Sequence, residues 1–178
     1  MELVKALTKE RQDRIYQLYL TAFPKSEQKP FKILIEKQEE GIVDLLSIEE
    51  DEHFLGLAIM VRYLDMVLLD YLAIDDGARN GGYGSLTIQA LLERYSGFRM
   101  ILEIDSTKEE QAADLSIRIR RKAFYHRNGL TDLPYQVNLW GNQMEMLSNG
   151  RPVSFEEYLS LYQESFGAGV SKNIGFLA

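Results

Sequence analysis

The sequence predicts an α/β fold of the α+β type, in one domain that spans residues 1–178. The first observation is length, because a chain of 178 residues buries roughly 70% of its unfolded surface and needs only one core. The second is the segment 67–94, which has the pattern of a buried strand, a glycine-rich turn and an amphipathic helix. The third is that strand-length and helix-length apolar patterns occur on both sides of this segment.

Composition excludes several classes of protein. The net charge of −7 and the pI near 5.0 argue against a nucleic-acid-binding surface. Because the chain has no cysteine, it has no disulfide, no thiolate metal ligand and no thiol nucleophile. The first residues, MELVKALTKERQ, lack the apolar core of a signal peptide, and no apolar run reaches membrane-spanning length. We therefore expect a soluble, cytoplasmic protein that binds neither nucleic acid nor a membrane.

The first forty residues predict one strand and two helices. A short strand is expected at 2–6, and Thr8 is expected to cap a helix whose apolar residues recur at helical spacing as far as Phe23. Pro30 should open a second helix, and Gly41 should mark its end.

Two apolar strands, at 42–48 and 54–63, predict an antiparallel hairpin. The residues between them, Glu49-Glu50-Asp51-Glu52-His53, read as an exposed acidic turn that includes His53. Four consecutive acids could also suggest a metal site, but on a turn their carboxylates would point apart without supporting hydrogen bonds. The sequence therefore predicts no metal site.

The central segment carries the clearest motif. Residues 67–74 form a nearly continuous apolar run that suits a strand covered on both faces. Arg-x-x-Gly-x-Gly then runs from Arg79 to Gly84 and leads into an amphipathic helix. Glycines let backbone amides approach a ligand, and a helix N-terminus attracts anions. Neither the Gly-Lys-Ser/Thr of an ATP-binding P-loop nor the GxGxxG of a dinucleotide site is present, so we predict an anion site of another kind.

A strand and a long helix are expected next. The strand should cover 98–105, and Thr107 with Glu110 forms a capping box that should open a helix reaching Asn128. This helix gathers the densest positive charge of the chain: Arg118, Arg120, Arg121, Lys122 and Arg127. The basic residues are either solvated charges paired with nearby acids or a contact to the anionic end of a ligand. Nucleic acid is the weakest alternative, since no basic patch continues elsewhere.

The C-terminal part predicts a closing hairpin and one more helix. Strands at 136–140 and 143–147 should turn around Gly141-Asn142, and Ser154-x-x-Glu157 is a second capping box. No element is assigned to residues 167–178, which we expect to be loosely held.

These motifs resemble those of the GNAT superfamily of acyl-CoA-dependent N-acyltransferases. The pyrophosphate loop of that family carries Arg/Gln-x-x-Gly-x-Gly/Ala after a strand ending Leu-x-Val/Ile, and here Leu72-Ala73-Ile74 precedes the motif. A second family signature, Phe/Leu-Tyr-x-x-x-Gly-Phe, is similar to Phe124-Tyr125-x-x-x-Gly129-Leu130. Where the family often has Asn and a small residue earlier in the helix, this chain has Arg118 and Arg121. The resemblance implies a mixed, mostly antiparallel central sheet flanked by helices.

The resemblance also implies a reaction and its cofactor. The chain would transfer an acetyl or longer acyl group from acetyl-CoA directly to a primary amine, without a metal, as either a monomer or a homodimer. Direct transfer agrees with the lack of a cysteine nucleophile. Residues expected to contact acetyl-CoA are Leu72, Ala73, Ile74, Arg79, Asn80, Gly81, Gly82, Tyr83, Gly84 and Ser85, with Arg121 as a further candidate.

Tyr125 is the candidate general acid in this scheme. A tyrosine with a reference pKa near 10 keeps its proton at pH 7, so it could donate that proton to a departing thiolate, whose thiol has a pKa near 8.5. The alternative is that Tyr125 is a core aromatic residue beside Phe124.

Two carboxylates are candidates for the general base. Glu103 and Asp70 interrupt strands that are otherwise apolar, which is costly unless a partner or a function compensates. The resemblance favours Glu103, because some family members use a glutamate in a similar Leu-Glu-Val segment. The structural alternative is that the carboxylate pairs with an arginine such as Arg121.

A different class of function stays open. The same fold could serve as a catalytically inactive, acyl-CoA-binding regulatory module, and the departures at Arg118 and Arg121 keep this alternative open. The acceptor cannot be read from the sequence, because small amines, antibiotics, peptide N-termini and protein lysines all satisfy the same motifs.

Overall fold

The chain forms two compact units, as seen in the computed structural model, which describes all 178 residues. The first unit comprises Met1–Arg62 and Leu69–Arg94, and the second comprises Tyr63–Leu68 and Tyr95–Ala178. Strand β4 (Met66–Ile74) therefore begins in the second unit and ends in the first. None of the helices combines the length and the apolar character needed to cross a bilayer.

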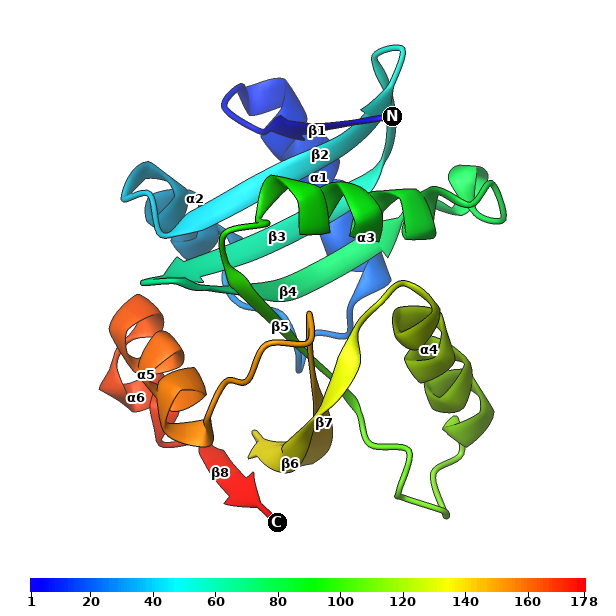
Figure 1. The fold of residues 1–178 in the computed structure, drawn as a ribbon. Coiled ribbons are helices and arrows are strands. Elements are labelled where there is room, and N and C mark those ends of the chain that lie inside the picture. Colours follow the sequence, from blue (N-terminus) through cyan, green and yellow to red (C-terminus); the bar gives the residue numbers. More distant parts are fainter. The chain divides into compact units, whose positions relative to one another are not determined.

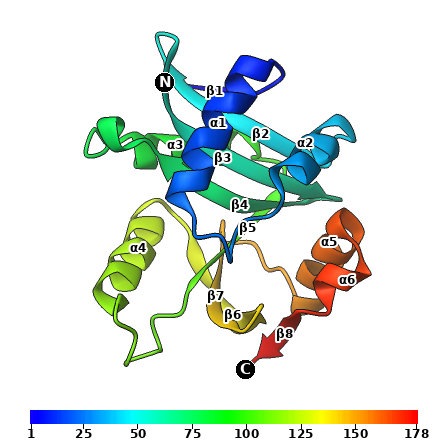
Figure 2. The ribbon, with the colours of Figure 1, turned by 180° about the vertical axis from the view of Figure 1, so that it is seen from behind.

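The first unit is a sheet with helices on both faces. Besides the end of β4 it contains β1 (Glu2–Lys5), α1 (Lys9–Ala22), α2 (Phe31–Glu39), β2 (Val43–Glu50), β3 (His53–Tyr63), the 3-10 helix η1 (Asp76–Ala78) and α3 (Tyr83–Arg94). The strands lie in the order β1-β2-β3-β4, and both β1 and β3 pair with β2 in antiparallel register. Helix α3 covers one face of these strands, and α1 and α2 cover the other (Figure 1, Figure 2).

Burial on both faces explains the composition of the central strands. Six consecutive residues of β3, 56–61, are buried, and all of them except the glycine are apolar, as expected for a strand that helices cover on both sides. The predicted cap of the first helix is confirmed, because the side chain of Thr8 accepts a hydrogen bond from the backbone N–H of Arg11.

The acidic turn between β2 and β3 is shorter than predicted. Glu49 and Glu50 belong to β2, and His53 is the first residue of β3 and not part of the turn. Only Asp51 and Glu52 form the turn, with φ of 48° and 66°, which is the left-handed backbone of a two-residue hairpin turn. Glu49 is only 6% exposed. Its carboxylate is tolerated in the strand because the ion pair with Arg11, at 2.9 Å, compensates for its burial.

The second unit is also a sheet with helices on two sides. Besides the start of β4 it contains β5 (Arg99–Asp105), α4 (Leu115–Arg127), β6 (Thr131–Leu139), β7 (Asn142–Ser148), α5 (Phe155–Phe166), α6 (Ala168–Ser171) and β8 (Ile174–Leu177). The strand order is β4-β5-β7-β6-β8; β4 and β5 pair in parallel, whereas β5–β7, β6–β7 and β6–β8 are antiparallel. In both views α4 and α5 lie on opposite sides of these strands (Figure 1, Figure 2). The predicted mixed, mostly antiparallel sheet with flanking helices is confirmed.

The helix predicted to begin at Thr107 begins only at Leu115. The capping box at Thr107 does not form, because the backbone N–H and the hydroxyl of Thr107 both donate to Glu145 of β7, each at 2.6 Å. The carboxylate of Glu145 therefore binds the two groups of Thr107 that a helix cap would have used. Residues 107–114 form turns instead.

The C-terminal part differs from the prediction at two places. The closing hairpin turns at Trp140 and Gly141, with φ of 49° and 86°, one residue earlier than predicted. Residues 167–178 contain α6 and β8, and β8 pairs with β6 as an edge strand. The second capping box, at Ser154 and Glu157, is present as predicted.

Candidate functional site

The loop between β4 and α3 leaves the first amides of a helix without helical partners. The N–H of Leu86 donates to the carbonyl of Gly82 at 3.2 Å, which closes the first turn of α3, and the amides that open a helix are the ones its own ladder does not use. Asn80 and Gly82 have φ of 68° and 77°. A Cβ on Gly82 would have no atom within 4 Å, so the space beside this residue is open. The loop therefore fits an anionic group bound by backbone amides.

The side chains of the loop mostly serve its own shape. Arg79 pairs with Asp76 at 2.8 Å and donates to the carbonyl of Ile74 at 3.4 Å. A Cβ on Gly81 would lie 2.8 Å from the ring of Tyr83, so only glycine lets this ring fold over the loop. The backbone, more than these side chains, is thus presented to a ligand.

The end of β4 leads directly into this loop. Leu72, Ala73 and Ile74 are half-buried residues at the end of the strand, and Asp75 then caps η1 by accepting from the N–H of Gly77 at 3.0 Å. Within the first unit the structure therefore brings two predicted contact segments, 72–74 and 79–85, together on one strand, loop and helix.

Asp70, also on β4, is ion-paired. Lys29 donates to both of its carboxylate oxygens at 2.8 Å, and the two side chains are only 5% and 18% exposed. The Lys29 ammonium also lies 5.1 Å from the ring centre of Tyr71, and the Tyr71 hydroxyl donates to the carbonyl of Glu27 at 2.6 Å. These contacts tie the segment between α1 and α2 to β4. A structural partner thus compensates the burial of Asp70.

Replacement of Lys29 by alanine is expected to destabilise the fold by about 3–5 kcal/mol, because it leaves a buried carboxylate without its cation. Lys32→Ala is the matched control, since the side chain of Lys32 is 87% exposed beside Glu36 and such pairs contribute only a few tenths of a kcal/mol, roughly 0.3–0.5. Urea unfolding of both variants measures the difference. Equal losses in the two variants would contradict the buried-pair assignment.

Tyr125 lies in the last turn of α4 and is 9% exposed. Burial raises the pKa of its phenol, and the nearby charge of Arg121 offsets this in part. Its ring lies 5.2 Å from that of Phe124, in an edge-on arrangement. Tyr125 is therefore a protonated phenol at neutral pH, as a general acid must be. It also packs against Phe124, as expected for a core aromatic residue.

Glu103 is held by two tyrosines of α5. The hydroxyls of Tyr158 and Tyr162 both donate to its Oε1, each at 2.7 Å. Burial and the charge of Glu103 raise the pKa of Tyr158 well above its usual value, so this phenol remains a donor. The predicted pairing of this carboxylate with Arg121 is wrong. Arg121 pairs with Asp105 at 3.0 Å instead.

Much of the positive charge of α4 is paired with acids nearby. Arg118 pairs with Glu109 and Asp114, which confirms for this residue the prediction of paired helix charges. Lys122 pairs with Asp132 and with Glu145. Arg121 remains half exposed beside Asp105. No three His, Cys, Asp or Glu side chains lie together in a way that could hold a metal ion.

The predicted site residues divide between the two units. Asp70, 72–74 and 79–85 lie in the first, and Glu103, Arg121 and Tyr125 lie in the second. Three partners of the two carboxylates, Asp70 and Glu103, were missed from the sequence: Lys29, Tyr158 and Tyr162. The four-residue spacing of the two tyrosines does indicate one face of a helix, but nothing in it points to the strand that this face covers.

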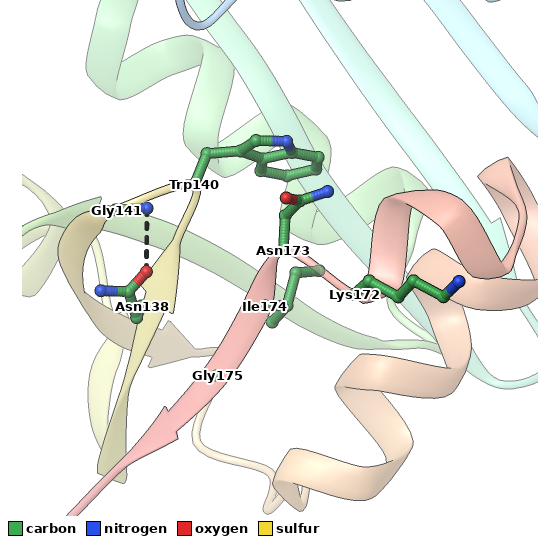
Figure 3. Close-up of a pocket in the computed structure, with 7 residues that line it drawn as sticks. All are labelled: Asn138, Trp140, Gly141, Lys172, Asn173, Ile174 and Gly175. Atoms are coloured by element: carbon green, nitrogen blue, oxygen red, sulfur yellow. Dashed lines mark hydrogen bonds between the residues drawn. The ribbon is translucent and has the colours of Figure 1, made fainter.

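A separate hollow of about 440 Å³ lies at the tip of the β6–β7 hairpin, lined by Asn138, Trp140, Gly141, Lys172, Asn173, Ile174 and Gly175. Figure 3 shows the indole of Trp140 above Asn173, with Lys172 extending away from it. The N–H of Trp140 donates to the carbonyl of Asn173 at 2.9 Å, and the side chain of Asn138 accepts from Gly141. These contacts hold the hairpin tip against β8. None of the predicted site residues lines this hollow.

The sequence matches the Acetyltransferase (GNAT) family over residues 12–129, a range that contains the first motif and the second as far as Gly129. The chain belongs to this family. No curated protein sequence matches the chain.

Solved structures of the family share the fold. A GNAT-family protein from Bacteroides thetaiotaomicron is 20% identical with a TM-score of 0.75, and the match covers 96% of this chain and 99% of that one. An aminoglycoside 6'-N-acetyltransferase complexed with coenzyme A is 14% identical with a TM-score of 0.64, over 86% of this chain and 100% of its own. The ribosomal-protein-S18-alanine N-acetyltransferase from Escherichia coli is 15% identical with a TM-score of 0.63, over 86% and 99%. At these identities the likeness establishes the GNAT fold alone.

Proposed function

We propose that this chain is an N-acetyltransferase that moves an acetyl group from acetyl-CoA to a primary amine. The observation that carries the proposal is the β4–loop–α3 segment of a GNAT-family chain, in which the loop leads directly into the N-terminus of α3 and the space beside Gly82 is open. Two structural neighbours, the aminoglycoside enzyme and an acetyltransferase from Bacillus subtilis, are complexes with coenzyme A, which supports the choice of cofactor.

The loop and the strand end have different parts in this proposal. The amides of 79–85 would hold the pyrophosphate through hydrogen bonds and the positive end of the helix dipole. Backbone groups of 72–74 would hold the pantetheine arm and polarise the thioester carbonyl, as the family resemblance implies. Arg121 is already ion-paired with Asp105, so its contribution to phosphate binding is expected to be smaller than that of the loop.

The reaction needs one proton acceptor and one proton donor. When bound, acetyl-CoA supplies the acetyl thioester: a C–N bond to the amine forms and the C–S bond breaks. Glu103, with Asp70 as the alternate, would take the proton from the ammonium so that the amine can attack. Tyr125 would give its phenolic proton to the thiolate. Asp70 would first have to release Lys29, which favours Glu103.

The competing function is an inactive, acyl-CoA-binding module. A turnover assay separates the two: purified protein, acetyl-CoA and a panel of amines, with detection of free thiol. Amine-dependent release of thiol supports the enzyme. Binding of acetyl-CoA by calorimetry without any amine-dependent thiol would establish the binding module, and longer acyl-CoA donors in the same assay define the acyl group.

Gly82→Val and Gly84→Val are expected to abolish measurable acetyl-CoA binding, because a branched side chain would obstruct the approach of a phosphate to the amides. Gly150→Val is the matched control: Gly150 has φ of 83° and no atom within 4 Å of its Cβ position, like Gly82, but lies outside the loop. Calorimetry with acetyl-CoA is the measurement. Folded Gly82 and Gly84 variants with unchanged affinity would refute the proposed pyrophosphate site.

A further inference from the structure

The β2–β3 hairpin contacts both ends of the loop that connects β4 with α3. At the start of the loop, the N–H of Asp75 donates to the carbonyl of Leu55 at 2.8 Å. At its end, the hydroxyl of Tyr83 donates to Glu50 Oε2 at 2.6 Å. Gly56 lies against the last residues of β4. We call Glu50, Leu55 and Gly56 the hairpin clamp.

We propose that the hairpin clamp positions the cofactor loop, so that Gly56 and Glu50 determine the affinity for acetyl-CoA without touching it. The proposal rests on the proposed function for its ligand. The contacts themselves all lie within the first unit.

An irregularity in β3 makes the first contact. Ile48 pairs with Gly56, but the next residue, Glu49, pairs with Phe54. Leu55 is therefore the extra residue of a β-bulge and has no opposite residue on β2. The carbonyl of Leu55 accepts the hydrogen bond from the N–H of Asp75, the residue that follows β4 and whose side chain caps η1. The bulge thus determines where the chain leaves the strand and turns into the loop.

Gly56 brings β3 unusually close to the end of β4. A Cβ at this position would lie 2.3 Å from the carbonyl oxygen of Ala73 and 3.1 Å from the Cα of Ile74. Both neighbours are backbone atoms, so they cannot rotate away as a side chain could. Any larger residue at 56 must displace Ala73 and Ile74, the segment proposed to hold the pantetheine arm.

The second contact holds the first residue of α3. The hydrogen bond from Tyr83 lowers the pKa of Glu50, so this carboxylate is charged and accepts at neutral pH. It also lies 3.4 Å from the amino group of Met1. Because the ring of Tyr83 folds over Gly81, fixing this ring also fixes the middle of the loop. The acids that the sequence assigns to a solvated turn thus include a loop-positioning residue.

Gly56→Ala tests the first contact, with Gly97→Ala as control, because a Cβ on Gly97 would meet nothing within 4 Å. A displacement of about 1 Å can cost about 10²-fold, so we expect the Kd and KM for acetyl-CoA to rise at least about tenfold in Gly56→Ala. The KM for the amine should stay near that of the wild type. A merely structural role would lower the melting temperature while leaving acetyl-CoA affinity unchanged below the unfolding transition.

Tyr83→Phe, Glu50→Ala and the double variant test the second contact, with Glu52→Ala as control. Each single change should weaken acetyl-CoA binding a few-fold, about the effect of one lost hydrogen bond. The double variant should lose no more than Glu50→Ala alone, because Glu50→Ala already removes the hydrogen bond from Tyr83.

Hydrogen exchange of the free protein tests the clamp independently of acetyl-CoA binding. Hydrogen exchange of the amides of 75–85 should be faster in Gly56→Ala than in the wild type and unchanged in Gly97→Ala. If the wild type binds no acetyl-CoA, the proposed function fails, and faster exchange would still support the clamp. Unchanged exchange and unchanged acetyl-CoA affinity in folded Gly56→Ala overturn the clamp.

Discussion

Tyr125→Phe is expected to lower kcat by about 10²- to 10⁴-fold, the usual contribution of a general acid. The substitution keeps the ring against Phe124 and removes only the hydroxyl group that carries the ionisable proton, so acetyl-CoA affinity should change little. Burial raises the pKa of this phenol, so its proton stays bound beyond the ordinary tyrosine value near 10. Deprotonation of Tyr125 should therefore not reduce the rate of the wild type below about pH 10.

The control for this prediction is Tyr95→Phe. Tyr95 is another buried tyrosine of the second unit, 4% exposed, and it has no place in the proposed reaction, so its variant should keep the wild-type kcat. Single-turnover measurements ensure that chemistry, and not product release, limits the rate. A Tyr125→Phe enzyme within twofold of the wild type under those conditions would return Tyr125 to the role of a core aromatic residue.

Local sequence patterns predicted elements wherever a helix or strand depends on its own residues. The cap at Thr8 and the capping box at Ser154 form as expected, because each satisfies amides within three residues along the chain. The identical pattern at Thr107 fails because Glu145, 38 residues away, takes both donors. No local signal reveals such a competitor. The edge strand β8 was missed for a related reason: its four residues, Ile174–Leu177, form a strand by pairing with β6, and so short a segment shows no alternation that would indicate a strand by itself.

The motifs predicted the β4–loop–α3 segment better than the surroundings of the candidate catalytic residues. Residues 72–85 are contiguous, so a spacing rule captures the strand, the turn and the helix together. The partners of the two carboxylates are distant in sequence: Lys29 is 41 residues from Asp70, and Tyr158 is 55 residues from Glu103. A buried carboxylate indicates that another group must compensate for the cost of its burial. Only the fold tells whether that partner is an ammonium, a guanidinium or a phenol.

Glu103→Gln is expected to abolish the acidic limb of the kcat/KM profile and to lower the rate by about 10²- to 10⁴-fold, if Glu103 is the general base. The limb arises because a base must be unprotonated to accept the proton of the ammonium. Asp70→Asn is the matched comparison, because Asp70 is the other acid within an apolar strand and already pairs with Lys29. A Gln variant that retains both the rate and the limb would exclude Glu103. Loss of the limb in Asp70→Asn alone would move the role to Asp70.

Substitution of Tyr158 and Tyr162 tests whether Glu103 is the group that produces the acidic limb. Tyr158 and Tyr162 both donate to one oxygen of Glu103, and hydrogen bonds to a carboxylate favour its charged form. The Tyr158→Phe/Tyr162→Phe double variant should therefore move the acidic limb to higher pH, whereas each single variant should move it by less. This shift is specific to Glu103 as the titrating group, because a purely structural role for the tyrosines would change the melting temperature and leave the limb in place. If the limb does not move in a folded double variant, the group that produces it is not the carboxylate that these phenols hold.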